Sequence, residues 1–146
     1  MSEDRHNQDR DERDETLAEA LRSVAHQLRR ISVESLARWE VSPSQSRALR
    51  VLTRHGSIRL TELSEHLRIA PRSATEVVDD LQAKGLVERR PDPQDRRATL
   101  VCVTEHGIEI GEAIRSAQGA EAERLFDRLT ATDRDHLARI LRKLRA

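Results

Sequence analysis

Residues 60–81 read LTELSEHLRIAPRSATEVVDDL, and this stretch decides the fold. Apolar residues recur at helical spacing on both sides of a break at Ile69-Ala70-Pro71. Proline suits the first turn of a helix because the N–H that it lacks would have no partner there, so Pro71 marks the start of a second helix. The pattern therefore predicts two short helices joined by a tight turn, a helix-turn-helix.

A predicted β-hairpin follows directly. Gly85 ends the second helix, and residues 86–90 (LVERR) form a strand that pairs with residues 98–103 (ATLVCV). The loop between the strands, residues 91–97, reads PDPQDRR. An arginine at the tip of such a hairpin can enter a narrow minor groove, where the negative potential of DNA is strongest. The hairpin is therefore predicted to be a DNA-binding wing.

The second helix carries Arg72, Ser73 and Thr75 in its first turns. In a helix-turn-helix, these positions of the recognition helix face base edges in the major groove. The sequence thus places two elements that contact double-stranded DNA next to each other.

At this point the chain resembles the MarR family of bacterial winged helix-turn-helix regulators. Three segments within residues 81–107 carry the resemblance most specifically: LQAKGLVER, PDPQDRRA and LVCVTEHG. The resemblance spans nearly the whole chain. It implies a homodimer that binds a pseudo-palindromic operator, usually as a repressor, and that often releases the DNA when a small ligand or an oxidant arrives.

The wing tip and the recognition helix contain further site residues. We expect Arg97 to enter the minor groove, with Asp95 holding its guanidinium in a forked pair, and Arg96 to meet a phosphate or solvent. Two departures from the family pattern concern the recognition helix. Ala70 replaces the usual hydroxyl cap, and acidic residues, Glu76 and Asp80, stand where basic ones are common. We expect Glu76 to pair with a neighbouring arginine rather than to accept from a cytosine amino group.

The composition favours one mainly helical domain. The chain has 146 residues, the size of one ordinary domain. Aromatic residues make up 1% of it, and Trp39 and Phe126 are the only large rings, so Leu, Ile, Val and Ala must build the core. We therefore predict a mainly α fold with a small β-hairpin wing.

Charge is unevenly distributed along the chain. The net charge is zero, although a DNA-binding protein gains most sequence-independent affinity by neutralising phosphates. Residues 44–104 hold eleven basic and eight acidic residues, a net charge of +3, whereas residues 1–15 hold three arginines and seven carboxylates, a net charge of −4. Residues 1–15 are too poor in apolar side chains to order themselves. We predict a flexible acidic arm at 1–15 and a single domain at 16–146.

Both ends of this domain carry an apolar helical stripe with coiled-coil spacing. The stripes are formed by Leu17, Leu21, Val24, Leu28 and Ile31, and by Leu137, Ile140, Leu141 and Leu144. We predict that residues 16–41 and 105–146 form dimerisation helices on either side of a winged helix-turn-helix at 42–104. The alternative that the stripes close the core of a monomer remains open.

Two helix starts can be read from capping residues. Ser42 and Gln45 fit a capping box, with Pro43 at the first helical position of a helix that reaches about Arg54. Thr132 is the predicted N-cap of the last helix, which follows a helix over residues 105–129.

An effector pocket is expected where the long helices meet the winged part. On the first helix His26, Arg29, Arg30 and Trp39 are candidates to receive an aromatic acid. The six histidines lack paired metal-ligand spacing, so no metal site and no cofactor are predicted. Cys102, the only cysteine, lies in a predicted strand and is expected to be a buried apolar residue rather than an oxidant sensor.

Other functional classes find little support in the sequence. It has no glycine-rich phosphate loop, nucleophile elbow or metal-ligand pair, so we do not expect an enzyme. No apolar run reaches the length of a membrane span, which favours a cytoplasmic protein. The sequence predicts a sequence-specific DNA-binding transcriptional regulator that acts as a repressor. A transcriptional activator and a winged domain that binds another protein remain alternatives.

Overall fold

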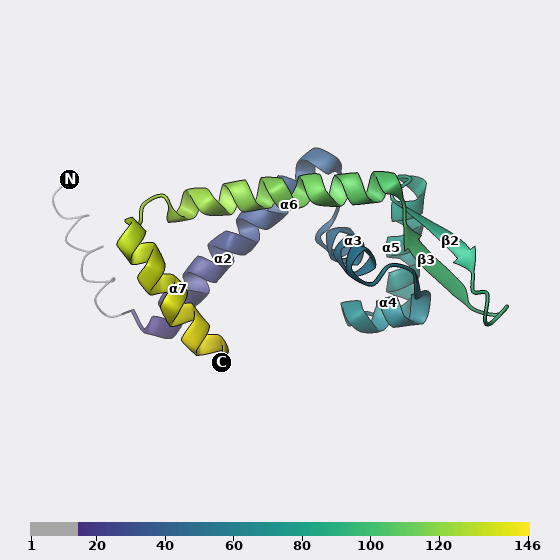
Figure 1. Cartoon of the computed structure of the whole chain (residues 1–146), viewed down its shortest axis with the longest axis horizontal. Helices are drawn as coiled ribbons and strands as arrows, with labels where there is room; N and C mark the ends of the chain where they lie inside the picture. The colour runs from purple at the N-terminus through teal and green to yellow at the C-terminus, as the bar shows by residue number, and fades with distance from the viewer. Residues whose placement is uncertain (1–14) are drawn as a thin grey trace.

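The structure, a computed structural model, describes residues 15–146, so the predicted acidic arm lies outside the described residues except for Glu15. The longest helix, α6 (Glu105–Phe126), runs along the length of the molecule (Figure 1). Helix α7 (Ala131–Arg145) and the start of α2 (Leu17–Leu36) lie at one end of it, and the winged part lies at the other. Helix α2 packs chiefly against α6.

The winged domain is a compact group of three helices and a small sheet. Its helices are α3 (Pro43–His55), α4 (Leu60–Leu67) and α5 (Pro71–Ala83), and a short 3-10 helix, η1 (Ala37–Trp39), connects α2 to α3. Its strands are β1 (Ile58–Arg59), β2 (Val87–Pro91) and β3 (Thr99–Val103). These observations confirm the predicted fold class, mainly α with a β-hairpin wing.

The wing is one side of a three-stranded antiparallel sheet with the order β1-β3-β2. The predicted hairpin is confirmed, with Val87 opposite Val103 and Pro91 opposite Thr99. Strand β1 was not predicted, because two residues are too short to show a strand pattern. It pairs Ile58 with Val101 and so attaches the hairpin to the start of α4.

The helix ends follow local capping chemistry. The Ser42 capping box is confirmed, with Gln45 N donating to Ser42 Oγ at 3.1 Å and Ser42 N donating to Gln45 Oε1 at 3.1 Å. The predicted cap at Thr132 is wrong: Thr130 and Asp133 form the capping box of α7, and Thr132 lies inside the first turn. The preceding helix accordingly ends at Phe126, three residues earlier than predicted.

The core lies between the three winged-domain helices and the sheet. Its largest fully buried side chains are Leu49, Leu52, Leu63, Leu67, Leu81, Val78, Val87 and Val101. The first turn of α6 closes this core from outside: a Cβ on Gly107 would lie 2.0 Å from Leu86 O, so only glycine allows the approach. Among the described residues, no helix is both long and apolar enough to cross a membrane.

Candidate nucleic-acid interface

The first turn of the recognition helix α5 is exposed to solvent. Ala70 is its N-cap residue and makes no side-chain cap hydrogen bond, while Pro71 occupies the first turn. The side chains of Arg72 and Ser73 are exposed. Thr75 Oγ1 donates to Pro71 O at 3.0 Å. The Thr75 side chain can therefore offer a base only a hydroxyl oxygen that accepts a hydrogen bond, or its methyl group.

The acidic side chains of α5 are mostly engaged with the protein itself. Asp79 Oδ1 lies 2.6 Å from Arg89 Nη2, and Asp80 Oδ2 accepts from Gln45 Nε2 at 3.3 Å. The prediction that Glu76 pairs with an arginine is wrong: no ion pair within residues 15–146 involves Glu76, and the pair forms one turn later. Glu76 is exposed and has no ion-pair partner within residues 15–146, and Asp80, whose partner is a neutral amide, keeps its negative charge.

Arg89 braces the wing against the recognition helix. Its side chain is 27% exposed, and besides Asp79 it contacts Gln82, with Nη1 donating to Oε1 at 2.5 Å. This brace joins strand β2 to two successive turns of α5. Reasoning from the sequence missed it, because only the fold brings residue 89 back to residues 79–82.

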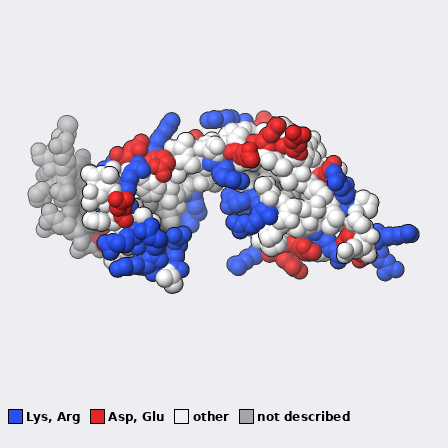
Figure 2. All heavy atoms as spheres, in the orientation of Figure 1, with Lys and Arg blue, Asp and Glu red and all other residues white. Residues whose placement is uncertain are grey.

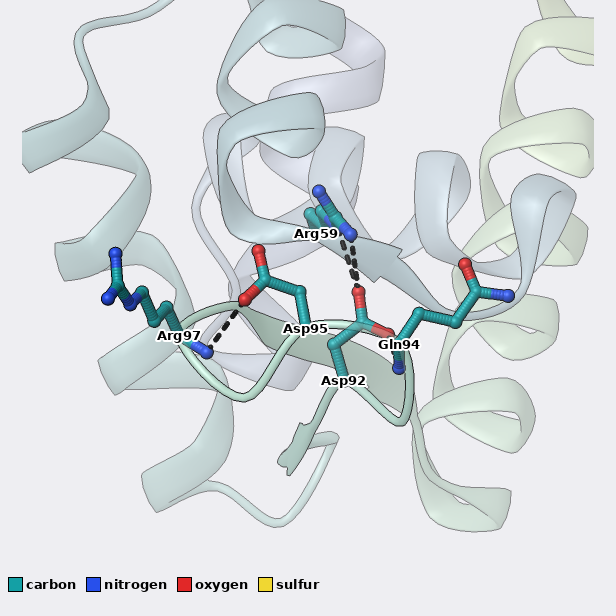
Figure 3. A network of polar contacts seen from close by, with 5 residues as sticks. All are labelled: Arg59, Asp92, Gln94, Asp95 and Arg97. Atoms are coloured by element: carbon teal, nitrogen blue, oxygen red, sulfur yellow. Dashed lines mark hydrogen bonds and ion pairs between the residues drawn. The ribbon is translucent and has the colours of Figure 1, made fainter.

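The wing tip, residues 92–98, is shaped by its own backbone contacts. Asp92 N donates to Ala98 O at 3.1 Å, and Asp95 Oδ1 accepts from the backbone N of Arg97 at 3.0 Å. The predicted fork between Asp95 and the Arg97 guanidinium is wrong, because the short carboxylate reaches the N–H two residues on and forms an Asx turn. The side chain of Arg97 extends away from the loop (Figure 3). Arg96 is exposed beside it.

An ion pair between the partly exposed Arg59 and the buried Asp92 holds the first residue of the wing tip. Arg59 Nε and Nη2 lie 2.9 Å and 2.8 Å from Asp92 Oδ2, and Asp92 is only 8% exposed (Figure 3). Asp92 Oδ1 also accepts from Gln94 N at 2.9 Å. The bond from Gln94 N lowers the pKa of the Asp92 carboxyl, and Arg59 lowers it further. The ion pair fixes the wing to the residue that precedes α4.

The two predicted DNA-contacting elements therefore belong to one braced unit. Arg89 connects the wing to α5, and the pair of Arg59 and Asp92 connects it to the start of α4. An open cavity of about 360 Å³ lies between the wing tip and α4, and Arg59, Thr61 and Arg97 are among its lining residues. Figure 2 shows basic side chains projecting from the outer end of the molecule, where the wing lies.

The predicted effector residues lie apart from the cavity at the junction of the long helices and the winged domain. A cavity of about 400 Å³ does lie between α3 and α6, but His26, Arg30 and Trp39 are not among its lining residues. Arg30 pairs with Glu34 at 3.6 Å on the exposed surface of α2, and Trp39 packs against the core with the Arg38 guanidinium 5.1 Å from its ring. The polar residues that line the cavity between α3 and α6 are Ser46, Arg50, Thr53, Arg115 and Gln118.

The thiol and the histidines have other environments. Cys102 is buried, as expected, and its Sγ lies 2.9 Å from Ser57 Oγ. His55 and His66 stack with ring centroids 4.5 Å apart. Within residues 15–146, no three His, Cys, Asp or Glu side chains form a group that could hold a metal ion.

Comparisons with known proteins agree with this geometry. The family model described as MarR family matches residues 41–99. The transcriptional repressor MdtR of Bacillus subtilis is 27% identical over 125 residues, which are 86% of this chain and 81% of MdtR. A helix-turn-helix-type transcriptional regulator of Mycobacterium leprae is 34% identical over 82% of this chain and 78% of its own length. The structure is similar to that of MarR from E. coli in its apo form, with a TM-score of 0.79 and 28% identity over 89% of this chain and 96% of that one.

Proposed function

The chain belongs to the MarR family and is a DNA-binding transcriptional regulator, and from this premise we propose that it acts as a repressor, bound as a homodimer to a pseudo-palindromic operator. Regulators of this family are transcription factors rather than enzymes. A cytoplasmic location follows from the proposed role, because the operator lies on the bacterial chromosome.

One observation carries the proposal: the start of α5 and the wing tip are exposed arginine-bearing ends of a single braced domain. In our assignment Arg72 and Ser73 contact base edges in the major groove, and Thr75 offers its methyl group or accepts a hydrogen bond there. Arg97 enters the adjacent minor groove and Arg96 meets a phosphate. Asp95 shapes the tip through the backbone of Arg97.

Exposed apolar side chains on the two ends of the chain support the homodimer. Leu17, Leu21 and Val24 of α2 are 91%, 50% and 40% exposed, and Ile140 and Leu144 of α7 are 46% and 67% exposed. A stripe of this kind is expected to be covered by a second copy, since water contact with so many large apolar groups is unfavourable. We assign residues 16–41 and 105–146 to the dimer interface and residues 42–104 to the winged domain.

The cavity between α3 and α6 is our candidate for the effector site. Its lining combines Arg50 of the winged domain and Arg115 of the long helix with the apolar side chains of Leu49 and Ile114. Gly111 and Gly119 leave open space at the α6 wall. Two guanidiniums together with apolar side chains suit a small aromatic acid, and such a ligand would contact both the winged domain and the long helix, whose relative angle matters for DNA binding.

A gel shift with the intergenic DNA upstream of the protein's own gene tests the function. We expect a discrete complex of dimer size that resists a scrambled competitor and weakens steeply with added salt. The double variant Arg72→Ala, Arg97→Ala should lose the specific complex while the protein stays folded and dimeric. A wild-type complex that is insensitive to salt, or one that the double variant retains, would contradict the proposal and favour a protein-binding winged domain.

The effector assignment has its own test. Aromatic carboxylates such as salicylate or benzoate, titrated into the operator complex, should release the DNA from the wild type. Arg50→Met with Arg115→Met should keep binding the operator and lose this response. Release that is equal in the two proteins would place the ligand elsewhere.

A further inference from the structure

Lys84 ties the end of the recognition helix to the connection between α2 and α3. It is the C-cap residue of α5, and its Nζ donates to the backbone O of Glu40 and to Gln45 Oε1, the latter at 3.1 Å. Glu40 and Gln45 are about forty residues away in sequence and lie on either side of the start of α3. The ammonium group therefore bridges two parts of the chain that the helix-turn-helix itself does not join.

The connection that Lys84 contacts is short and has an unusual backbone conformation. It consists of η1, Glu40, the buried Val41 and the N-cap residue Ser42. Glu40 has φ 54° and ψ 36°, a left-handed conformation that residues other than glycine rarely adopt. Such a conformation persists when its surroundings hold it, and the bond from Lys84 to Glu40 O is one such restraint.

Gln45 extends the network to a second point on α5. Its side chain is 8% exposed, and its oxygen accepts from Ser42 N and from Lys84 Nζ, both at 3.1 Å. Its Nε2 donates to Asp80 Oδ2 at 3.3 Å. One amide thus joins the first turn of α3 to α5 at Asp80 and at Lys84, and both of its polar atoms are used.

The network occupies the place where the long helices pass into the winged domain. The extensive packing of α5 is with α3, α4 and β2, whereas α2 packs chiefly against α6 (Figure 1). Lys84 is thus a direct polar link from the recognition helix to the connection through which α2 passes into α3. In a two-fold dimer, the angle at this junction sets the distance between the two recognition helices.

We propose that Lys84 is a positioning residue that holds the winged domain at one angle to the long helices and so selects the half-site spacing that the dimer accepts. The inference rests on the proposed function for its second half, the spacing on DNA. Its first half, the angle within one chain, is independent of DNA and of dimerisation.

The first experiment measures that angle without DNA. Spin labels at Arg22→Cys on α2 and Arg96→Cys on the wing, in a Cys102→Ala background, give the distance between the two parts of one chain when labelled protein is diluted into unlabelled protein. We expect Lys84→Met to broaden or shift the distance distribution and Lys84→Arg, which keeps a cation at this site, to restore the wild-type distribution. A Lys84→Met distribution that overlays the wild type would overturn the proposal.

The second experiment uses operators in which the two half-sites are moved apart or together one base pair at a time. Lys84→Met should bind the native spacing about three- to tenfold more weakly, the size expected for a partly exposed charged hydrogen bond, and should show a flatter dependence on spacing. Its affinity for a DNA with a single half-site should equal that of the wild type. Arg54→Met, which removes a positive charge from α3 outside the network, should keep the wild-type spacing profile.

Two outcomes in this series would contradict the assignment. One is a Lys84→Met profile with wild-type shape, and the other is an equal loss on the single half-site, which would mean that Lys84 supports the recognition helix itself. If circular dichroism shows that Lys84→Met loses helix, Lys84→Gln replaces it as a milder removal of the charge. A wild-type protein that binds no operator would refute the proposed function, and the spin-label distances would still decide the role of Lys84.

Discussion

At the scale of single residues, the neighbouring wing-tip arginines Arg96 and Arg97 differ in how their backbone is restrained. Asp95 accepts from the backbone of Arg97 and so sets where the Arg97 side chain leaves the loop, whereas the structure describes no such restraint on Arg96. A preset direction lowers the entropy that a side chain loses on entering a groove. The two positions should therefore differ in their contribution to operator binding.

Arg97→Ala should weaken operator binding by roughly 1–3 kcal/mol, as expected for loss of a minor-groove arginine, and leave the dimer intact. Arg96→Ala, the matched control, should cost less and should mainly reduce the salt dependence, since it removes a phosphate contact. Fluorescence anisotropy in a salt series measures both. Equal losses of operator affinity for the two variants, or an unchanged affinity for Arg97→Ala, would contradict the assignment of Arg97 to the minor groove.

The ion pair of Asp92 with Arg59 should make stability depend on pH. Because the pKa of Asp92 is lowered in the fold, its stabilising contribution is present above the ordinary pKa of an aspartate and is lost as the pH falls through the folded value. Urea unfolding should show Asp92→Asn less stable than the wild type at about pH 7 and a narrowing difference toward about pH 3, below the ordinary pKa of about 3.9. Asp135→Asn, an exposed control, should show no such trend, and a constant difference for Asp92→Asn would argue against the ion pair.

At the scale of elements, most boundaries follow from chemistry within a few residues. Pro71 and the capping box at Ser42 start their helices where the sequence predicts. Thr130 and Thr132 each have an aspartate three residues on, Asp133 and Asp135, so the local pattern allows either cap. The structure selects Thr130, whose backbone N and side chain both bond to Asp133. Side-chain pairs across elements, such as Arg89 with Asp79, followed no local pattern, whereas the predicted fork of Asp95 with Arg97 failed because Asp95 forms a local Asx turn.

The start of α5 offers a stabilising substitution. Ala70 has the extended backbone of an N-cap residue, with φ −62° and ψ 147°, but no side-chain acceptor for the first N–H groups of the helix. Ala70→Ser should add that acceptor and stabilise the fold by about 1 kcal/mol. Ala83→Ser, at the far end of the same helix, is the control and should give no gain. Thermal or urea unfolding measures the difference, and a destabilised Ala70→Ser would show that the cap geometry is not available to a side chain.

At the scale of the whole molecule, acidic and basic side chains are unevenly distributed over the surface. Figure 2 shows Asp and Glu gathered over α6 and in a second group at α4, and Lys and Arg over α7, beside α3, and at the wing. The zero net charge of the chain therefore does not describe the surface that would meet DNA. The apolar stripes of α2 and α7 lie far from the wing, at the other end of the molecule.

Leu21→Glu should shift the protein from dimer to monomer, because it places a charge in the apolar stripe of α2. Two winged domains bound as one unit gain avidity, so operator affinity should fall by roughly 100-fold or more, while single half-site binding is kept. Ser23→Glu, on the exposed face of the same helix, is the matched control. Sedimentation velocity gives the oligomeric state, and a Leu21→Glu protein that remains a dimer would exclude this stripe from the interface.

The sequence by itself determined the helix-turn-helix, the hairpin, and which side chains stand at the helix start and the wing tip. These features depend on periodicity, proline and glycine positions and caps, which act over a few residues. Only the tertiary structure decided the third strand, the pairs Arg89–Asp79 and Arg59–Asp92, the lining of the cavity between α3 and α6, and the contacts of Lys84. All of these join residues from different elements, and their partners are chosen by how the helices and the sheet pack around the leucine-rich core.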